Sequence, residues 1–123
     1  KPLLAIDWSP ASLRAVEYLK VLKDVINEIH IIHVVSQKEL KGTSAMEIQS
    51  IRKKTRKKLD KICDIFEEIG VKADAHVYIG NAEQEIEKAA REHQASMIVL
   101  GSSGKTAWVE RWLGSTPQSI AED

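Results

Sequence analysis

Residues 97–104 have the sequence MIVLGSSG, a run of apolar residues that ends at Gly101. The four apolar residues predict a short buried strand, and the small residues after them predict a loop. A buried strand that leads into a glycine-rich loop is typical of parallel α/β proteins, in which ligands bind beyond the carboxyl ends of strands. This segment therefore suggests a fold class that the rest of the chain can test.

The rest of the chain alternates strand patterns with helix patterns. Apolar strands are predicted at residues 3–6 and 29–35, and an alternating, half-exposed strand at 71–79, at a sheet edge. Helices are predicted from Ser9 and Pro10 onward, from 45 to 69 with Gly70 closing the helix, and from 83 to 93. This order predicts an α/β, Rossmann-like open parallel sheet with strand order 3-2-1-4 and helices on both faces.

Length and composition predict one globular domain. The chain has 123 residues, of which 43% are hydrophobic and 29% charged. Its 18 Lys and Arg residues balance 18 Asp and Glu residues, so no net field draws it to nucleic acid or to anionic membranes. The apolar runs are strand-sized, and we expect no membrane insertion. The single cysteine, Cys63, excludes an internal disulfide, suits a cytoplasmic location and is expected in the core.

The chemistry is expected at the edge where the first and fourth strands end. Asp7 ends the first strand and Gly101 ends the fourth, and the order 3-2-1-4 makes these strands neighbours beside one crevice. Glycines let backbone N–H groups approach a phosphate closely, and a helix starting near Ser115 would favour an anion. The Asp7 carboxylate suits a sugar hydroxyl or an adenine amino group. The predicted phosphate-binding residues are Gly101, Gly104, Gly114, Ser115 and Thr116.

The tripeptide from Gly104 to Thr106 imitates the end of a Walker A loop. That motif needs a glycine five residues earlier, where this chain has Val99, and its Lys and Thr must open a helix directly. We therefore expect no P-loop here. No nucleophile–base pair is recognisable either, so an enzyme is the less favoured hypothesis, with a weak ATPase activity at most.

Several of these features together resemble the universal stress protein family. They are Asp7 after the first strand, IHIIHVV at 29–35, Gly80, MIVLG at 97–101, and the G-x2-G-x9-G-S pattern from Gly101 to Ser115. The resemblance extends from Leu3 to about Ile120, and the loop pattern accompanies the ATP-binding members. It implies a sheet in the order 3-2-1-4-5, a nucleotide-binding site, and ATP, ADP or AMP as the ligand, with or without Mg²⁺. In that site Val34 would hold adenine through its backbone, Asp7 would lie by the adenosine, and Leu100 would join the glycine loop.

The chain also departs from the family pattern. Trp8 stands where a small residue usually follows the aspartate, and Ser96 replaces the usual aspartate before the fourth strand. The fifth strand is expected to be missing from this chain, which puts the usual family dimer in doubt. We therefore expect residues 1–123 to form a single domain, C-terminally truncated or half of a tandem, completed by a homodimer or tandem-domain partner.

Three functions are compatible with the sequence. The leading hypothesis is an adenine-nucleotide-binding regulatory domain in a stress response, which acts as a nucleotide-dependent switch with slow or no hydrolysis. The alternatives are a non-nucleotide protein-interaction domain of a tandem stress protein or transporter, and a slow ATP hydrolase.

The histidines and the basic run have simpler explanations than a binding role. His30 and His33 are three residues apart on a strand, so they point to opposite faces. His76 is expected on an exposed strand face and His93 at a helix end, so we expect no metal site. The run RKKTRKK at residues 52–58 is expected to form the solvated side of a helix rather than a nucleic-acid site.

Overall fold

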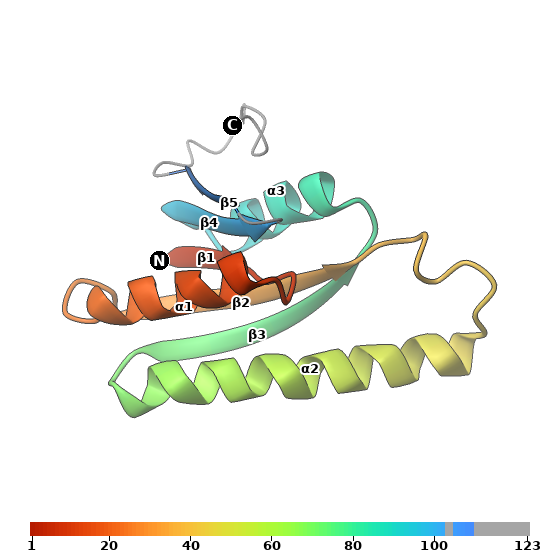
Figure 1. Ribbon diagram of the computed structural model, residues 1–123, viewed down its shortest axis with the longest axis horizontal. Helices are drawn as coiled ribbons and strands as arrows, with labels where there is room; N and C mark the ends of the chain where they lie inside the picture. The colour runs from red at the N-terminus through yellow and green to blue at the C-terminus, as the bar shows by residue number, and fades with distance from the viewer. Residues whose placement is uncertain (103–104, 110–123) are drawn as a thin grey trace.

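The computed structural model of the chain describes residues 1–102 and 105–109. Within these residues the chain alternates strands with helices before it ends in two successive strands (Figure 1). The elements are β1 (Pro2–Ala5), α1 (Pro10–Val21), β2 (Glu28–Val35), α2 (Ala45–Glu68), β3 (Lys72–Ile79), α3 (Ala82–Glu92), β4 (Met97–Ser102) and β5 (Lys105–Val109).

The strands form one sheet in the order β3-β2-β1-β4-β5. β1 pairs in parallel with β2 on one side and with β4 on the other, so that Leu3 lies between His30 and Ile98. β3 pairs in parallel with β2 and forms one edge of the sheet. The predicted parallel sheet with the order 3-2-1-4 is confirmed, and so is the edge position of the third strand.

The expectation that the fifth strand is missing is wrong. β5 pairs with β4 in the antiparallel direction, with Gly101 opposite Thr106 and Ser102 opposite Lys105. An antiparallel neighbour needs only a short connection, and residues 103–104 alone separate the two strands in the sequence. Lys105–Val109 includes β-branched and aromatic residues, which favour a strand, although the sequence analysis assigned this segment to the loop. β5 therefore covers the edge of β4.

Helices cover both faces of the sheet, as predicted (Figure 1). α1 and α2 pack on one face, where Leu19 and Phe66 are fully buried against strand residues such as Ile31. α3 packs on the other face, where Ala89 and Ala90 are fully buried. Small residues on α3 let this helix lie close to the sheet. In the described part of the chain, no helix has the length and apolar character needed to cross a membrane.

Side chains at the helix starts explain where each helix begins. Ser9 caps α1 by accepting from the Ser12 N–H, and Pro10 occupies the first helical position, as predicted. α2 begins with a capping box, in which the Ser44 hydroxyl accepts from the Glu47 N–H at 3.2 Å and the Glu47 carboxylate accepts from the Ser44 N–H at 3.1 Å. Gly70 follows α2 with a φ of 89°, a conformation that suits glycine.

Replacing Ser44 with alanine tests the capping box. The variant loses the acceptor for the Glu47 N–H, so we expect Ser44→Ala to lower the free energy of unfolding by about 1 kcal/mol in urea denaturation. Ser50→Ala is the control, because Ser50 is exposed inside the same helix, where alanine is at least as good a helix former. Equal stabilities of the two variants would contradict the capping role.

Candidate functional site

The carboxyl edge of the sheet brings together the ends of β1 and β4. Ala5 pairs with Leu100, and Asp7 follows two residues after β1, while β4 continues through Gly101. β2 and β3 extend the sheet on one side of β1, and β4 and β5 extend it on the other, so the strand order reverses here. The structure thus places Asp7, Leu100 and Gly101 at one switch point of the sheet.

Asp7 caps the turn that leads into α1, and its carboxylate is exposed. Its Oδ1 accepts a hydrogen bond from the Ser9 N–H at 2.9 Å. An ionised carboxylate has about four acceptor positions on its two oxygens, so this one bond leaves capacity for a hydroxyl or amino group of a ligand. The structural role of Asp7 is therefore compatible with a binding role.

Val34 directs its backbone towards the same crevice. The Ile6 N–H donates to the Ile32 carbonyl at 2.8 Å, whereas the Gly80 N–H donates to the Val35 carbonyl at 3.0 Å. Successive residues of β2 therefore direct their backbone groups alternately to β1 and to β3. The backbone groups of Val34 point to the β1 side of β2, as those of Ile32 do. Ile32 pairs with Ala5, the last residue of β1, so Val34 lies beyond the end of β1 and its backbone groups face the crevice there.

Trp8, His33 and Lys58 line the α1 and α2 side of this edge. Trp8 has a φ of 67°, which is a strained conformation for a bulky residue. Its ring centroid lies 5.4 Å from that of His33, and the Lys58 ammonium lies 4.8 Å from the centre of the Trp8 ring. His33 Nδ1 lies 2.6 Å from the Ile6 carbonyl oxygen, which can only accept, so this nitrogen donates.

Trp8 could be singled out from the sequence, whereas its two neighbours could not. His33 is brought to Trp8 by the pairing of β2 with β1, and Lys58 by the packing of α2 against the sheet. No local pattern marks either contact, because each joins residues far apart in the sequence.

Four of the predicted phosphate-binding residues, Gly104, Gly114, Ser115 and Thr116, lie outside the described residues. Lys105 and Thr106 begin β5, whereas a Walker A motif needs its Lys and Thr to open a helix. Gly101 lies within β4, so the strand continues one residue beyond the predicted start of the loop.

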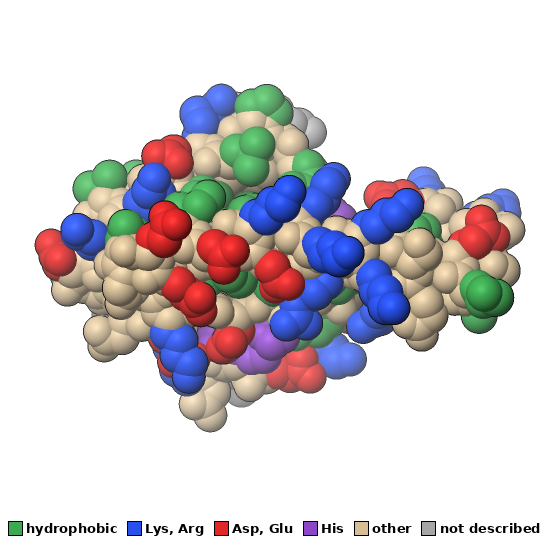
Figure 2. Space-filling view, turned by 90° about the horizontal axis from the view of Figure 1, so that it is seen from below, with side chains coloured by type: hydrophobic (Ala, Val, Ile, Leu, Met, Phe, Trp, Pro, Cys, Tyr) green, Lys and Arg blue, Asp and Glu red, His purple; other side chains and the backbone are tan. Residues whose placement is uncertain are grey.

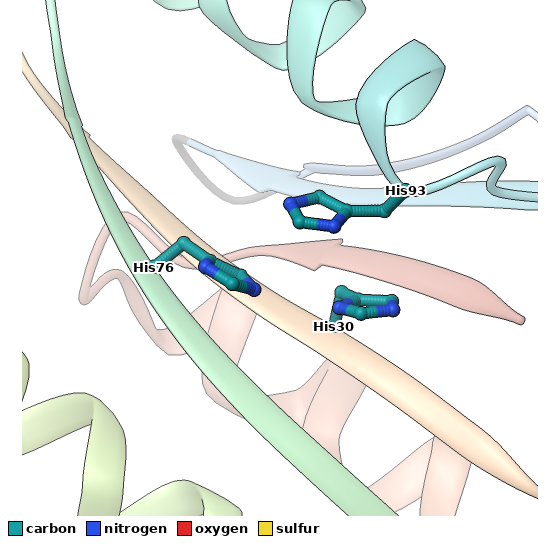
Figure 3. A group of neighbouring side chains, drawn as sticks. All are labelled: His30, His76 and His93. Atoms are coloured by element: carbon teal, nitrogen blue, oxygen red, sulfur yellow. The ribbon is translucent and has the colours of Figure 1, made fainter.

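A second polar cluster lies on the opposite face of the sheet, under α3. His30 and His76 project from adjacent parallel strands, where His76 pairs with Ile32, two residues beyond His30. His93 ends α3 as its C-cap residue and reaches back over both strands (Figure 3). The ring centroid of His93 lies 4.3 Å from that of His30 and 4.3 Å from that of His76.

The hydrogen bonds of this cluster determine which ring nitrogens carry protons. His30 Nε2 lies 3.0 Å from a Glu28 carboxylate oxygen, which can only accept, so Nε2 donates and Nδ1 keeps its lone pair. The Tyr78 hydroxyl donates to Glu92 at 3.2 Å and accepts from His93 Nε2 at 3.1 Å, an arrangement that leaves the lone pair of His93 on Nδ1.

The cluster is short of hydrogen-bond partners. His30 is only 6% exposed, and among the described residues its Nδ1 and the Nε2 of His76 are buried without a partner. Burial, and secondly the positive charge that His93 can carry, lower the pKa values of both His30 and His76, which favours the neutral form of the two rings. One ring nitrogen from each of the three histidines lies within 4.8 Å of a ring nitrogen of each of the other two. Neutral imidazoles in such a group are typical ligands of transition-metal ions.

The sequence analysis missed this cluster. His30 and His33 do point to opposite faces, as predicted: His33 contacts Trp8 on the α1 and α2 face, while His30 lies under α3. His76, however, is half-buried against His93, which corrects the expectation that it lies on an exposed strand face. The sequence did hold one signal for the face on which these histidines lie. His30 and Val34 are an even number of residues apart, as are His76 and Tyr78, so each pair points to one face of the sheet.

The basic run of α2 lies at the surface, as predicted. Arg52, Lys53, Lys54, Arg56, Lys57 and Lys58 are exposed, while Thr55 is buried. Figure 2 shows Lys and Arg gathered on one part of this face and Asp and Glu on another, with histidine side chains reaching the surface among them.

Comparisons with known proteins agree with this fold. A model of the universal stress protein family matches residues 1–123. The chain belongs to the universal stress protein family. The universal stress protein MJ0577 of Methanocaldococcus jannaschii is 24% identical in an alignment 140 positions long, which covers 98% of this chain and 86% of that protein. The family resemblance inferred from the sequence is thus confirmed.

Solved structures of other universal stress proteins have the same fold. The structure of MJ0577 has a TM-score of 0.73 to this chain, with 25% identity, covering 85% of this chain and 75% of that one. A universal stress protein family protein from Arabidopsis thaliana, solved with AMP bound, has a TM-score of 0.53 and 18% identity, covering 82% of this chain and 74% of that one.

Cys63 of this universal stress protein packs in the core on α2, as predicted. Burial, and then the nearby acidic residue Asp60, raise its pKa to about 11, so at pH 8 only about one thiol in a thousand is ionised. We expect Cys63 to react very slowly with an aromatic disulfide reagent in the folded protein and quickly in concentrated urea, as followed by absorbance. Equal rates in the two conditions would show that the thiol is accessible in the fold.

Proposed function

We propose that this universal stress protein binds an adenine nucleotide, ATP or a relative, at the switch point between β1 and β4. The observation that carries the proposal is the convergence there of the exposed Asp7 carboxylate, the β1-facing backbone of Val34 and the start of the glycine motif at Gly101. A carboxylate acceptor, backbone groups directed at a crevice and a glycine motif at one strand edge are suited to a nucleotide.

In this proposal each group has a distinct role. The backbone of Val34 hydrogen-bonds the adenine edge, and Leu100, which is half-buried beside β1, packs against the nucleoside. The Asp7 carboxylate accepts from a ribose hydroxyl. Backbone N–H groups of Gly101, Gly104 and Gly114, with the hydroxyls of Ser115 and Thr116, hold the phosphates, with Mg²⁺ where the nucleotide carries it.

Two further facts support a nucleotide ligand. The Arabidopsis thaliana relative was solved with AMP bound, so a protein of this fold holds an adenine nucleotide. The G-x2-G-x9-G-S motif is also complete in this sequence from Gly101 to Ser115. Trp8, flanked by His33 and Lys58, then stands beside the proposed site, and Lys58 brings positive charge near it.

The proposed role of the nucleotide is regulatory. The sequence supplies no Walker lysine, and the proposal assigns no general base, so binding rather than turnover is the expected output. The nucleotide would act as a switch on a second chain or tandem domain, and a cytoplasmic location remains a prediction. If the domain is instead a slow ATP hydrolase, steady phosphate release above background will follow from the same site.

Substitution of Asp7 tests the site directly. We expect isothermal titration with ATP and Mg²⁺ to show binding, and both Asp7→Ala and Asp7→Asn to weaken it about tenfold through loss of a charge-assisted hydrogen bond. Asp7→Asn retains an oxygen that can accept from the Ser9 N–H, so it separates ligand binding from the structural role of the turn.

Asp24→Ala is the matched control, because Asp24 is exposed and follows α1, towards the opposite edge of the sheet. Its affinity should equal that of the unchanged protein. Absence of binding heat with ATP, ADP and AMP in the high micromolar range, from a protein with an intact circular dichroism spectrum, rejects the nucleotide proposal. Binding that all three variants share equally rejects the role of Asp7.

A further inference from the structure

We propose that His30, His76 and His93 form a binding site for a divalent transition-metal ion, Zn²⁺ being the type case, on the α3 face of the sheet. The three side chains come from β2, β3 and the end of α3 (Figure 3). This site is distinct from the nucleotide crevice, since His30 lies towards the start of β2 whereas Val34 is near its end.

The unsatisfied nitrogens are the first argument. His30 Nδ1 and His76 Nε2 are buried without a hydrogen-bond partner among the described residues. Buried polar atoms in folded proteins nearly always have a partner, so such atoms need an explanation. A cation between them would be bound by both lone pairs and would account for two polar atoms that the fold otherwise leaves unpaired.

The partners of the other ring nitrogens are the second argument. Metal-binding histidines usually donate their second N–H to a carboxylate or another acceptor, which fixes the ring orientation and raises its basicity. Glu28 plays this part for His30 at 3.0 Å. The Tyr78 hydroxyl plays it for His93 at 3.1 Å and is itself bonded to Glu92.

Charge and protonation also suit a cation. Metal binding requires neutral imidazoles, and burial lowers the pKa values of His30 and His76, which favours that form. A carboxylate oxygen of Asp74 and one of Glu28 lie within 4.8 Å of a ring nitrogen of His30 and of each other. These carboxylates would offset part of the positive charge of the ion, and a water molecule would complete a four-coordinate shell.

Binding requires the rings to turn. The rings of His30 and His93 are inclined by 19° and those of His76 and His93 by 26°, so they are stacked rather than directed at one point. The candidate ligand atoms lie within 4.8 Å of one another, whereas a tetrahedral zinc shell needs about 3.3 Å between nitrogens. In the proposed site, rotation about the side-chain bonds of His76 and His93, which are half-buried, would bring the nitrogens together, and the Tyr78 hydroxyl would adjust with His93.

The ligand type selects the ion. Imidazole nitrogens suit Zn²⁺, Co²⁺, Ni²⁺ and Cu²⁺, whereas Mg²⁺ and Ca²⁺ prefer oxygen ligands. A bound ion would join β2, β3 and the end of α3, and it would stabilise the folded chain because the unfolded chain lacks the assembled site.

The test uses the full chain, freed of metal with a chelator and studied without nucleotide, because ATP itself binds divalent ions. We expect titration with Zn²⁺ to show a single ion per chain and a raised melting temperature, with no effect of Mg²⁺. Co²⁺ should give the visible absorption of a tetrahedral site. His76→Gln and His93→Gln should each weaken Zn²⁺ binding about 100-fold, and Glu28→Gln about tenfold through its effect on His30.

His33→Gln is the matched control, because His33 is a histidine of the same strand that points to the opposite face. Its Zn²⁺ affinity should be unchanged. Circular dichroism checks that each variant folds. Because His93 is only half-buried, we expect His93→Gln to leave the core intact. The proposal is overturned if Zn²⁺ does not bind, if the His76 and His93 variants bind it as well as the unchanged protein, or if His33→Gln removes the binding.

Discussion

The pairing of β1 along both of its edges is the constraint on which the rest of the structure depends. Leu3 and Leu4 are fully buried, and each pairs with β2 on one side and β4 on the other. With β1 in the centre, the chain must extend the sheet first to one side and then to the other. This reversal creates the strand edge where Asp7 and Gly101 meet, and it divides the helices between the two faces.

β2 places candidate functional side chains on both faces of the sheet. Alternate side chains of a strand point to opposite faces, so His30 joins the cluster under α3 while His33 contacts Trp8 beside α2. The backbone alternates as well, which turns Val34 towards the crevice. β2 therefore contributes to a proposed nucleotide site at its carboxyl end and to a proposed metal site nearer its start.

The two proposed sites differ in how they satisfy polar groups. At the strand edge, Asp7 is exposed and already bonded to the Ser9 N–H, so a ligand would add to a stable turn. Under α3, nitrogens of His30 and His76 are buried without partners in the part of the chain that the structure describes, an unfavourable arrangement that a cation would relieve. The backbone of Trp8 is also strained, and Trp8 lies beside the proposed nucleotide site. Backbone strain is often found at functional sites.

The sequence by itself determined the parallel sheet, its order 3-2-1-4, the three helices and the position of Asp7, because apolar periodicity and capping residues act over short distances. It also determined the family, because the motifs are local. Tertiary structure decided the rest. The antiparallel β5 depends on the free edge of β4, and the contact of Lys58 with Trp8 depends on how α2 packs. The histidine cluster depends on the register of β2 with β3 and on the end of α3, and no local pattern records distances between such distant residues.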